Sequence, residues 1–143
     1  LSNYDKVLDN KSSNYEGVVE TLLQLQSMSV KLGLCTNKPE KHARELLRRL
    51  GLIDFFKNSF IGSDTVGIAK PDPKPLIEAI NRLDKTPEDV FFVGDTNTDA
   101  KAAKNAGVDF IFCEYGHGSM YKLAKGESAA FKIETFADLI NIY

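Results

Sequence analysis

Two aspartates and one asparagine lie within five residues of each other in the stretch FVGDTNTDAKAAKNAG, which runs from Phe92 to Gly107. They are Asp95, Asn97 and Asp99. Carboxylate and amide oxygens are the ligands that hard cations such as Mg²⁺ and Ca²⁺ prefer in proteins. The spacing therefore raises the question of a metal site.

A calcium-binding EF-hand loop also begins with acidic or amide residues at every second position, as Asp95, Asn97 and Asp99 are here. Such a loop further needs Gly at its sixth position and Glu at its twelfth. This sequence has Ala100 and Ala106 at those positions, which excludes an EF-hand. Two interpretations remain open from these residues alone. Asp95 and Asp99 bind a cation such as Mg²⁺, or Asp95 turns the chain and Asp99 caps a helix.

The residues around the cluster predict where it lies in a fold. The apolar run Asp89–Val93 has the length and the β-branched, aromatic character of a buried strand. An alanine-rich helix follows Asp99 and ends near Gly107, a typical C-terminal cap. The cluster thus follows the carboxyl end of a strand, where α/β folds place their ligands.

Helices and strands alternate along the chain, which predicts an α/β fold, a Rossmann-like parallel sheet with helices on both faces. Besides the strand at 89–93 and the helix after Asp99, the expected strands are Val30–Cys35, Ser59–Ile61, Asp109–Cys113 and Phe131–Ile133. The other expected helices are Val18–Met28, Pro39–Leu50, Pro73–Leu83 and Phe136–Ile142. Residues 1–14 carry no strand signal.

Composition narrows the class of protein. The chain has 143 residues, 43% of them hydrophobic and 27% charged, which suits one globular domain. A net charge of −2 gives no reason to expect a nucleic acid or a membrane as partner. No apolar run approaches the roughly 20 residues that span a bilayer. Cys35 and Cys113 are interpreted as reduced, buried thiols, so we expect a cytoplasmic protein.

Three short motifs occur in order along the chain. In Leu32–Pro39 an apolar strand ends in a hydroxyl, and in Ala69–Pro73 a lysine comes just before a helix. The third motif is the acidic loop Val93–Asp99. With these motifs the chain resembles the haloacid dehalogenase superfamily of phosphotransferases, and most closely its phosphoglycolate phosphatase-like branch. The resemblance runs from about Tyr15 to Gly116.

The resemblance implies a role for each motif. The hydroxyl of Thr36 would form a hydrogen bond with the substrate phosphoryl group, and the backbone amide of Asn37 would assist. Lys70 would neutralise charge on the phosphoryl oxygens and on the attacking carboxylate. Asp95 would bind Mg²⁺, and Asp99 would support that metal site directly or through water. A hydroxyl, an ammonium and a metal suit phosphoryl transfer, which depends mostly on positioning and charge stabilisation.

The superfamily's nucleophile, the first aspartate of an Asp-x-Asp-x-Thr motif after the first strand, is not found in this sequence. Asp5 and Asp9 have the wrong spacing, and no apolar strand precedes them. We therefore interpret residues 1–14 as the tail of a cap domain and its linker, and residues 15–143 as the C-terminal portion of the core domain.

The missing nucleophile strand would be central, between the strand of Thr36 and the strand of Asp95. Its absence would leave strand edges unpaired in the interior. The hypothesis is that another segment, upstream in the same gene product, supplies this strand and the nucleophile. This chain alone would then be inactive.

The leading functional expectation is Mg²⁺-dependent hydrolysis of a small phosphate monoester through an aspartyl-phosphate intermediate. A sugar-phosphate mutase of the same superfamily and a non-catalytic module that retains the scaffold are the alternatives. His42 is expected to be exposed, and the loop residues Glu114, Tyr115 and His117 are assigned no role. The sequence does not identify the substrate.

Overall fold

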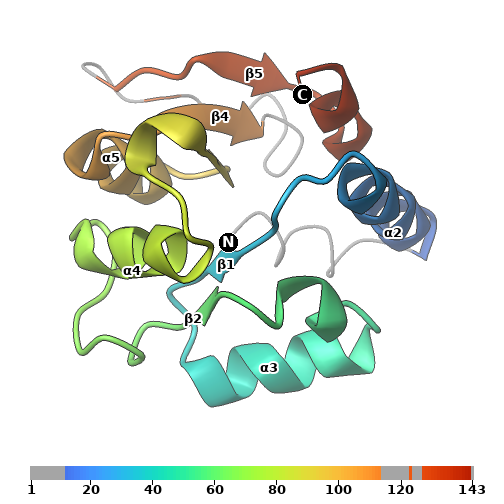
Figure 1. Cartoon of the computed structure of the whole chain (residues 1–143), viewed down its shortest axis with the longest axis horizontal. Coiled ribbons are helices and arrows are strands. Elements are labelled where there is room, and N and C mark those ends of the chain that lie inside the picture. The colour runs from blue at the N-terminus through green and yellow to red at the C-terminus, as the bar shows by residue number, and fades with distance from the viewer. Residues whose placement is uncertain (1–11, 114–122, 124–126, 143) are drawn as a thin grey trace.

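Helices and strands alternate along the computed structural model of the chain, which describes residues 12–113, 123 and 127–142 (Figure 1). The strands are β1 (Leu34–Cys35), β2 (Phe60–Ile61), β3 (Phe91–Gly94), β4 (Asp109–Cys113) and β5 (Phe131–Ile133). The α-helices are α2 (Ser12–Ser27), α3 (Glu40–Arg49), α4 (Lys74–Arg82) and α5 (Asn97–Ala106). Short 3-10 helices cover Ile53–Phe56, Pro87–Asp89 and Phe136–Asn141.

All strand pairings are parallel, and they form two separate sheets. One sheet has the order β1-β2, and the other has the order β3-β4-β5. In Figure 1, α4 and α5 lie on one side of the strands, and α2 lies on the other side with the helix at 136–141. The α/β class with helices on both faces is therefore confirmed. The described strands do not form one continuous sheet, because β1 and β3 do not pair.

The prediction of a strand over Val30–Cys35 was wrong for its first four residues. Only Leu34 and Cys35 pair, with Phe60 and Ile61 of β2. The N–H of Val30 instead donates to the carbonyl of Leu25 at the end of α2. A strand needs a neighbour to form its ladder, and β2 is only two residues long.

Other differences lie at the ends of elements. The first helix begins at Ser12 rather than Val18, so it crosses the expected boundary between residues 14 and 15. The domain assignment itself stays a prediction, because residues 1–11 lie outside the described part of the chain. The C-terminal helix is a 3-10 helix over Phe136–Asn141.

The hydrophobic core is continuous between the helices and both sheets. Val18, Leu22 and Leu25 recur at helical spacing on α2, and none is more than 2% exposed. The largest fully buried side chains elsewhere include Phe56, Phe60, Leu52, Ile111 and Phe112. None of the helices in the described residues is both long enough and apolar enough to cross a bilayer.

Helix α5, which carries the acidic cluster, has defined caps at both ends. The hydroxyl of Thr96 accepts a hydrogen bond from the N–H of Asp99 at 3.1 Å and so caps the N-terminus. Gly107 ends the helix in the left-handed region with φ 73°. The N–H of Val108 then bonds to the carbonyl of Ala103, which closes the last turn.

Gly107→Ala is expected to lower the free energy of unfolding by about 1 kcal/mol, because an L-residue with a Cβ is strained at positive φ. Gly17→Ala is the matched control, because Gly17 lies inside α2 and a Cβ there meets no atom within 4 Å. That change should stabilise the protein by roughly 0.5–1 kcal/mol. Denaturant unfolding of both variants tests this, and shifts of the same sign would contradict the assignment of α5's end.

Candidate active site at the carboxyl ends of the strands

Thr36 follows β1 directly and is 5% exposed. Its N–H donates to the carbonyl of Ile61 at 2.9 Å, which extends the parallel pairing with β2 and fixes the main chain. Its hydroxyl oxygen accepts a hydrogen bond from the N–H of Lys38 at 3.2 Å. Because that contact uses a lone pair, the hydroxyl hydrogen stays available for an acceptor such as a phosphoryl oxygen.

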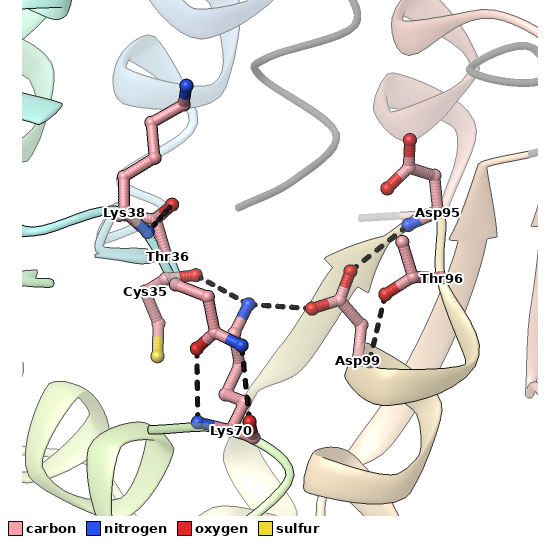
Figure 2. Close-up of polar contacts among 8 residues, drawn as sticks. Cys35, Thr36, Lys38, Lys70, Asp95, Thr96 and Asp99 are labelled. Carbon is pink, nitrogen blue, oxygen red and sulfur yellow. Dashed lines mark hydrogen bonds and ion pairs between the residues drawn. The ribbon is translucent and has the colours of Figure 1, made fainter. Parts of the chain in front are cut away.

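Lys70 is buried, although it lies in the irregular segment before α4. Its Nζ donates to the main-chain carbonyl of Cys35 at 3.1 Å and to Oδ1 of Asp99 at 2.6 Å (Figure 2). The ammonium also lies 5.1 Å from the ring centroid of Phe92. Since Cys35 belongs to β1 and Asp99 to α5, which follows β3, Lys70 connects the two sheets at their carboxyl ends.

Asp95 and Asp99 are the most deeply buried charged residues of the site, with 0% and 1% exposure. The N–H of Asp95 donates to Oδ2 of Asp99 at 3.3 Å, and Oδ1 of Asp99 accepts from Lys70 (Figure 2). Both residues lie at the N-terminal end of α5, where the helix dipole favours negative charge. The Asp99 carboxylate is thus held by the main chain of the turn and by one cation.

Gly94 makes this turn possible. A Cβ at that position would lie 2.5 Å from Oδ2 of Asp99 and 2.7 Å from its Cβ. Such distances are far below van der Waals contact, so only a residue without a side chain lets Asp99 fold back over the end of β3.

Asn37 has a role in the structure that sequence reasoning missed. Its side-chain oxygen accepts from the N–H of Lys70, and its side-chain nitrogen donates to the carbonyl of Lys70, both at 3.1 Å. The expectation concerned only the backbone amide of Asn37 and a phosphoryl group, which no contact in the structure tests. Because the two residues are 33 positions apart, no local sequence signal marks the pairing.

The structure therefore brings the expected site residues to one end of the strands. Thr36 and Asn37 follow β1, Asp95 follows β3, and Lys70 lies between them in contact with Asp99. Their roles in binding or catalysis stay predictions. His42 is exposed on α3, as expected. Residues 114, 115 and 117, the loop left without a role, lie outside the described residues.

The donor set is compatible with Mg²⁺, which is often held by one or two carboxylates together with water and substrate phosphate. Asp95 and Asp99 supply two buried carboxylates of that kind. Both oxygens of Asp99 already accept hydrogen bonds, Oδ1 from Lys70 and Oδ2 from the N–H of Asp95. No group of three or more His, Cys, Asp or Glu in the described part of the chain could hold a metal by itself.

Cys35 lies beside this site but does not have the character of a nucleophile. Burial raises the pKa of its thiol, and the nearby Lys70 ammonium only partly opposes that effect. A raised pKa keeps the sulfur protonated, whereas nucleophilic cysteines need a lowered pKa. Both Cys35 and Cys113 are buried free thiols.

A cavity of about 290 Å³ separates the two sheets. One wall is the run from Val30 to Cys35, and the opposite wall is the run from Asp89 to Val93. Apolar side chains from α2, α4 and the C-terminal helix close it, among them Leu25, Leu76 and Phe136. The cavity therefore lies where β1 and β3 would each need a neighbour to complete a single sheet.

Comparison with known proteins gives one consistent family. Residues 3–107 match the family model of the haloacid dehalogenase-like hydrolases. A phosphoglycolate phosphatase from Rhodospirillum rubrum is 38% identical over 90% of this chain and 52% of its own length. The chain thus spans about half the length of this curated relative.

Two solved structures are also similar. A haloacid dehalogenase phosphatase from Thermococcus onnurineus has a TM-score of 0.76 and 30% identity, covering 87% of this chain and 55% of that one. A candidate β-phosphoglucomutase from Thermotoga maritima has a TM-score of 0.73 and 30% identity, covering 88% of this chain and 57% of that one.

Lys70→Met is expected to lower the free energy of unfolding by roughly 3–5 kcal/mol, because it leaves the Asp99 carboxylate buried without its cation. Asp99→Asn strands the ammonium in the same way. The double variant should lose less free energy of unfolding than the two single variants lose together, by about 2 kcal/mol. Denaturant unfolding of the two single variants and the double variant measures this coupling.

The ion pair between Arg82 and Glu78 is the matched control, since its N–O distance is 2.8 Å but its side chains are 39% and 38% exposed. Alanine substitutions there should couple by less than about 0.5 kcal/mol. If the coupling at Lys70 and Asp99 is no larger than at this surface pair, the buried pair does not hold the site together.

Proposed function

This chain belongs to the haloacid dehalogenase-like hydrolases, and we propose that it forms part of a Mg²⁺-dependent phosphatase for small phosphate monoesters. The observation that carries the proposal is the convergence of the Thr36 hydroxyl, the Lys70 ammonium and two buried carboxylates at one end of the strands. Phosphoglycolate is the proposed substrate, because the curated relative from Rhodospirillum rubrum is a phosphoglycolate phosphatase.

The role proposed for each site residue is based on its contacts and on its chemistry. Thr36 donates its free hydroxyl hydrogen to one phosphoryl oxygen, and Lys70 neutralises charge on another. Asp95 holds Mg²⁺, and Asp99 keeps Lys70 in place. Bound Mg²⁺ would supply a Lewis acid that offsets the negative charge of the phosphoryl group.

The nucleophile is proposed to come from another segment, upstream in the same gene product. In the first step, an aspartate oxygen of that segment bonds to phosphorus while the bond to the alcohol oxygen breaks, and a second carboxylic acid protonates the leaving alcohol. In the second step, water attacks the aspartyl-phosphate and releases inorganic phosphate, with the second carboxylate taking the proton from water.

The cavity between the sheets supports this assignment of a missing strand. Residues of both β1 and β3 line this cavity, so an extended segment inserted there would have a strand edge on either side. The N–H groups of Leu34 and Thr36 point to β2, where they meet the carbonyls of Ser59 and Ile61. Alternate residues of a strand direct their N–H groups to opposite edges, so the N–H groups of Gly33 and Cys35 are expected to face the cavity.

A strand that runs parallel to β1 and β3 would end beside Thr36 and Asp95. Its first residue after the sheet would then face both the hydroxyl and the proposed metal ligand. A nucleophilic aspartate at that point would lie next to the proposed site. We also propose a cytoplasmic location, because both cysteines are buried free thiols, as expected in a reducing compartment.

A sugar-phosphate mutase remains the second candidate, favoured by the similarity to the candidate β-phosphoglucomutase from Thermotoga maritima. A mutase would return the phosphoryl group to a sugar, so an isomeric sugar phosphate would accumulate instead of inorganic phosphate. A non-catalytic module would bind Mg²⁺ and turn over neither substrate.

Phosphate release from phosphoglycolate is the first functional test. We expect none from residues 1–143 alone, and Mg²⁺-dependent release when the chain is joined to the segment encoded upstream. In that form Lys70→Met and Asp95→Asn should each lower kcat by at least roughly a hundredfold, as for loss of one charge-stabilising group.

Asp64→Asn is the matched control, because Asp64 is an exposed carboxylate whose Oδ1 accepts from the N–H of Glu40, a contact that an amide oxygen retains. It should leave kcat within about twofold. Full activity of the chain alone, or equal losses in all three variants, would contradict the proposed site.

Hydrogen exchange at the cavity wall tests the missing strand. In the chain alone, the amides of Gly33 and Cys35 should exchange much faster than those of β4, which is paired on both sides. When the upstream segment is present, these two amides should become protected. Equal protection of Cys35 and β4 in the chain alone would mean that no strand is missing from the cavity.

A further inference from the structure

Asn37 is the residue that joins the main chain of Lys70 to the end of β1. We propose that Asn37 is a positioning residue, whose side-chain amide fixes the main chain of Lys70 so that the ammonium reaches the strand ends. This inference rests on the proposed function for its catalytic meaning. Its structural content depends on neither a substrate nor a metal.

The main chain at Lys70 needs such an anchor because no regular element holds it. Between β2, which ends at Ile61, and α4, which begins at Lys74, the chain has no helix or strand. A lysine side chain is long and carries much conformational freedom. Its ammonium can stay at one point only if both ends of the residue are held.

The contacts hold both ends, and they all lead to β1 or α5. At the backbone end, the Asn37 amide occupies the N–H and the carbonyl of Lys70, both at 3.1 Å. At the other end, Nζ donates to the carbonyl of Cys35 and to Asp99. Since Thr36 lies between Cys35 and Asn37, the hydroxyl and the ammonium are fixed to one short stretch of chain.

The chemistry of asparagine suits this pairing. A side-chain amide carries one acceptor oxygen and one donor nitrogen, which match a peptide N–H and a peptide carbonyl at the same time. Aspartate at this position would still accept from the N–H of Lys70 but could not donate to its carbonyl. Alanine would lose both hydrogen bonds.

A second asparagine touches the same segment and provides the control. The Nδ2 of Asn105 on α5 donates to the carbonyl of Pro71 at 3.3 Å. This contact is also a hydrogen bond from an exposed asparagine side chain to the main chain, one residue further along. It involves neither polar main-chain group of Lys70, so its loss should leave the lysine in place.

The rate of reductive methylation of each lysine, with ¹³C-formaldehyde and cyanoborohydride and read by peptide mass spectrometry, measures how well Lys70 is held. In Asn37→Ala, Lys70 should be methylated roughly tenfold faster than in the wild type, as expected for the loss of two hydrogen bonds of ordinary net strength. Asn37→Asp should give an intermediate rate. Asn105→Ala should stay within about twofold of the wild type.

Labelling of the Cys113 thiol in the same samples separates positioning from general destabilisation, because Cys113 is 1% exposed on β4 and reacts only when the protein opens. We expect its rate to be unchanged in all three variants. The inference is overturned if Lys70 reacts at the wild-type rate in Asn37→Ala. It is also overturned if Cys113 accelerates in parallel, or if Asn105→Ala matches Asn37→Ala.

A double-mutant cycle on kcat then tests whether the position of Lys70 matters for catalysis. It uses the protein that includes the upstream segment. Asn37→Ala should lower kcat, and adding it to Lys70→Met should cause no further loss, because it acts through the lysine. Additive losses would mean that Asn37 acts on its own. If no form releases phosphate, the proposed function fails, while the methylation result still decides the role of Asn37.

Discussion

The arrangement of this molecule depends on one buried ammonium group. Nζ of Lys70 contacts the carbonyl of Cys35 on one sheet and the carboxylate of Asp99, next to the other sheet. The sheets do not pair with each other, so this polar bridge and the shared hydrophobic core are what join the strand ends that carry Thr36 and Asp95. A buried charge of this kind is costly to desolvate, so its place in an irregular segment is better explained by a task at the site than by stability.

The separation of the two sheets is what the proposed missing strand would account for. The chain spans about half the length of its curated relative from Rhodospirillum rubrum, and the cavity is lined by residues of both β1 and β3. Under that proposal, Val30–Gly33 has the sequence of a strand but no ladder because its partner strand is on another segment. A β-rich sequence takes strand geometry only when a partner satisfies its main chain.

Much of the fold and the location of the site could be predicted from the sequence. The apolar run before Gly94 and the alanines after Asp99 predicted β3 and α5, because their patterns are local. Two contacts were not predicted: the ion pair of Asp99 with Lys70, and the hydrogen bonds of the Asn37 side chain to the Lys70 main chain. Both join residues about 30 positions apart, which periodicity and capping rules do not relate.

The most direct test of the central claim is a crystal structure of the form that includes the upstream segment, grown with Mg²⁺ and inorganic phosphate. The account predicts a phosphate oxygen within hydrogen-bond distance of the Thr36 hydroxyl and another beside Lys70. It also predicts Mg²⁺ on Asp95 and one added strand between β1 and β3. Phosphate bound elsewhere, or the two sheets still separated by the cavity, would contradict it.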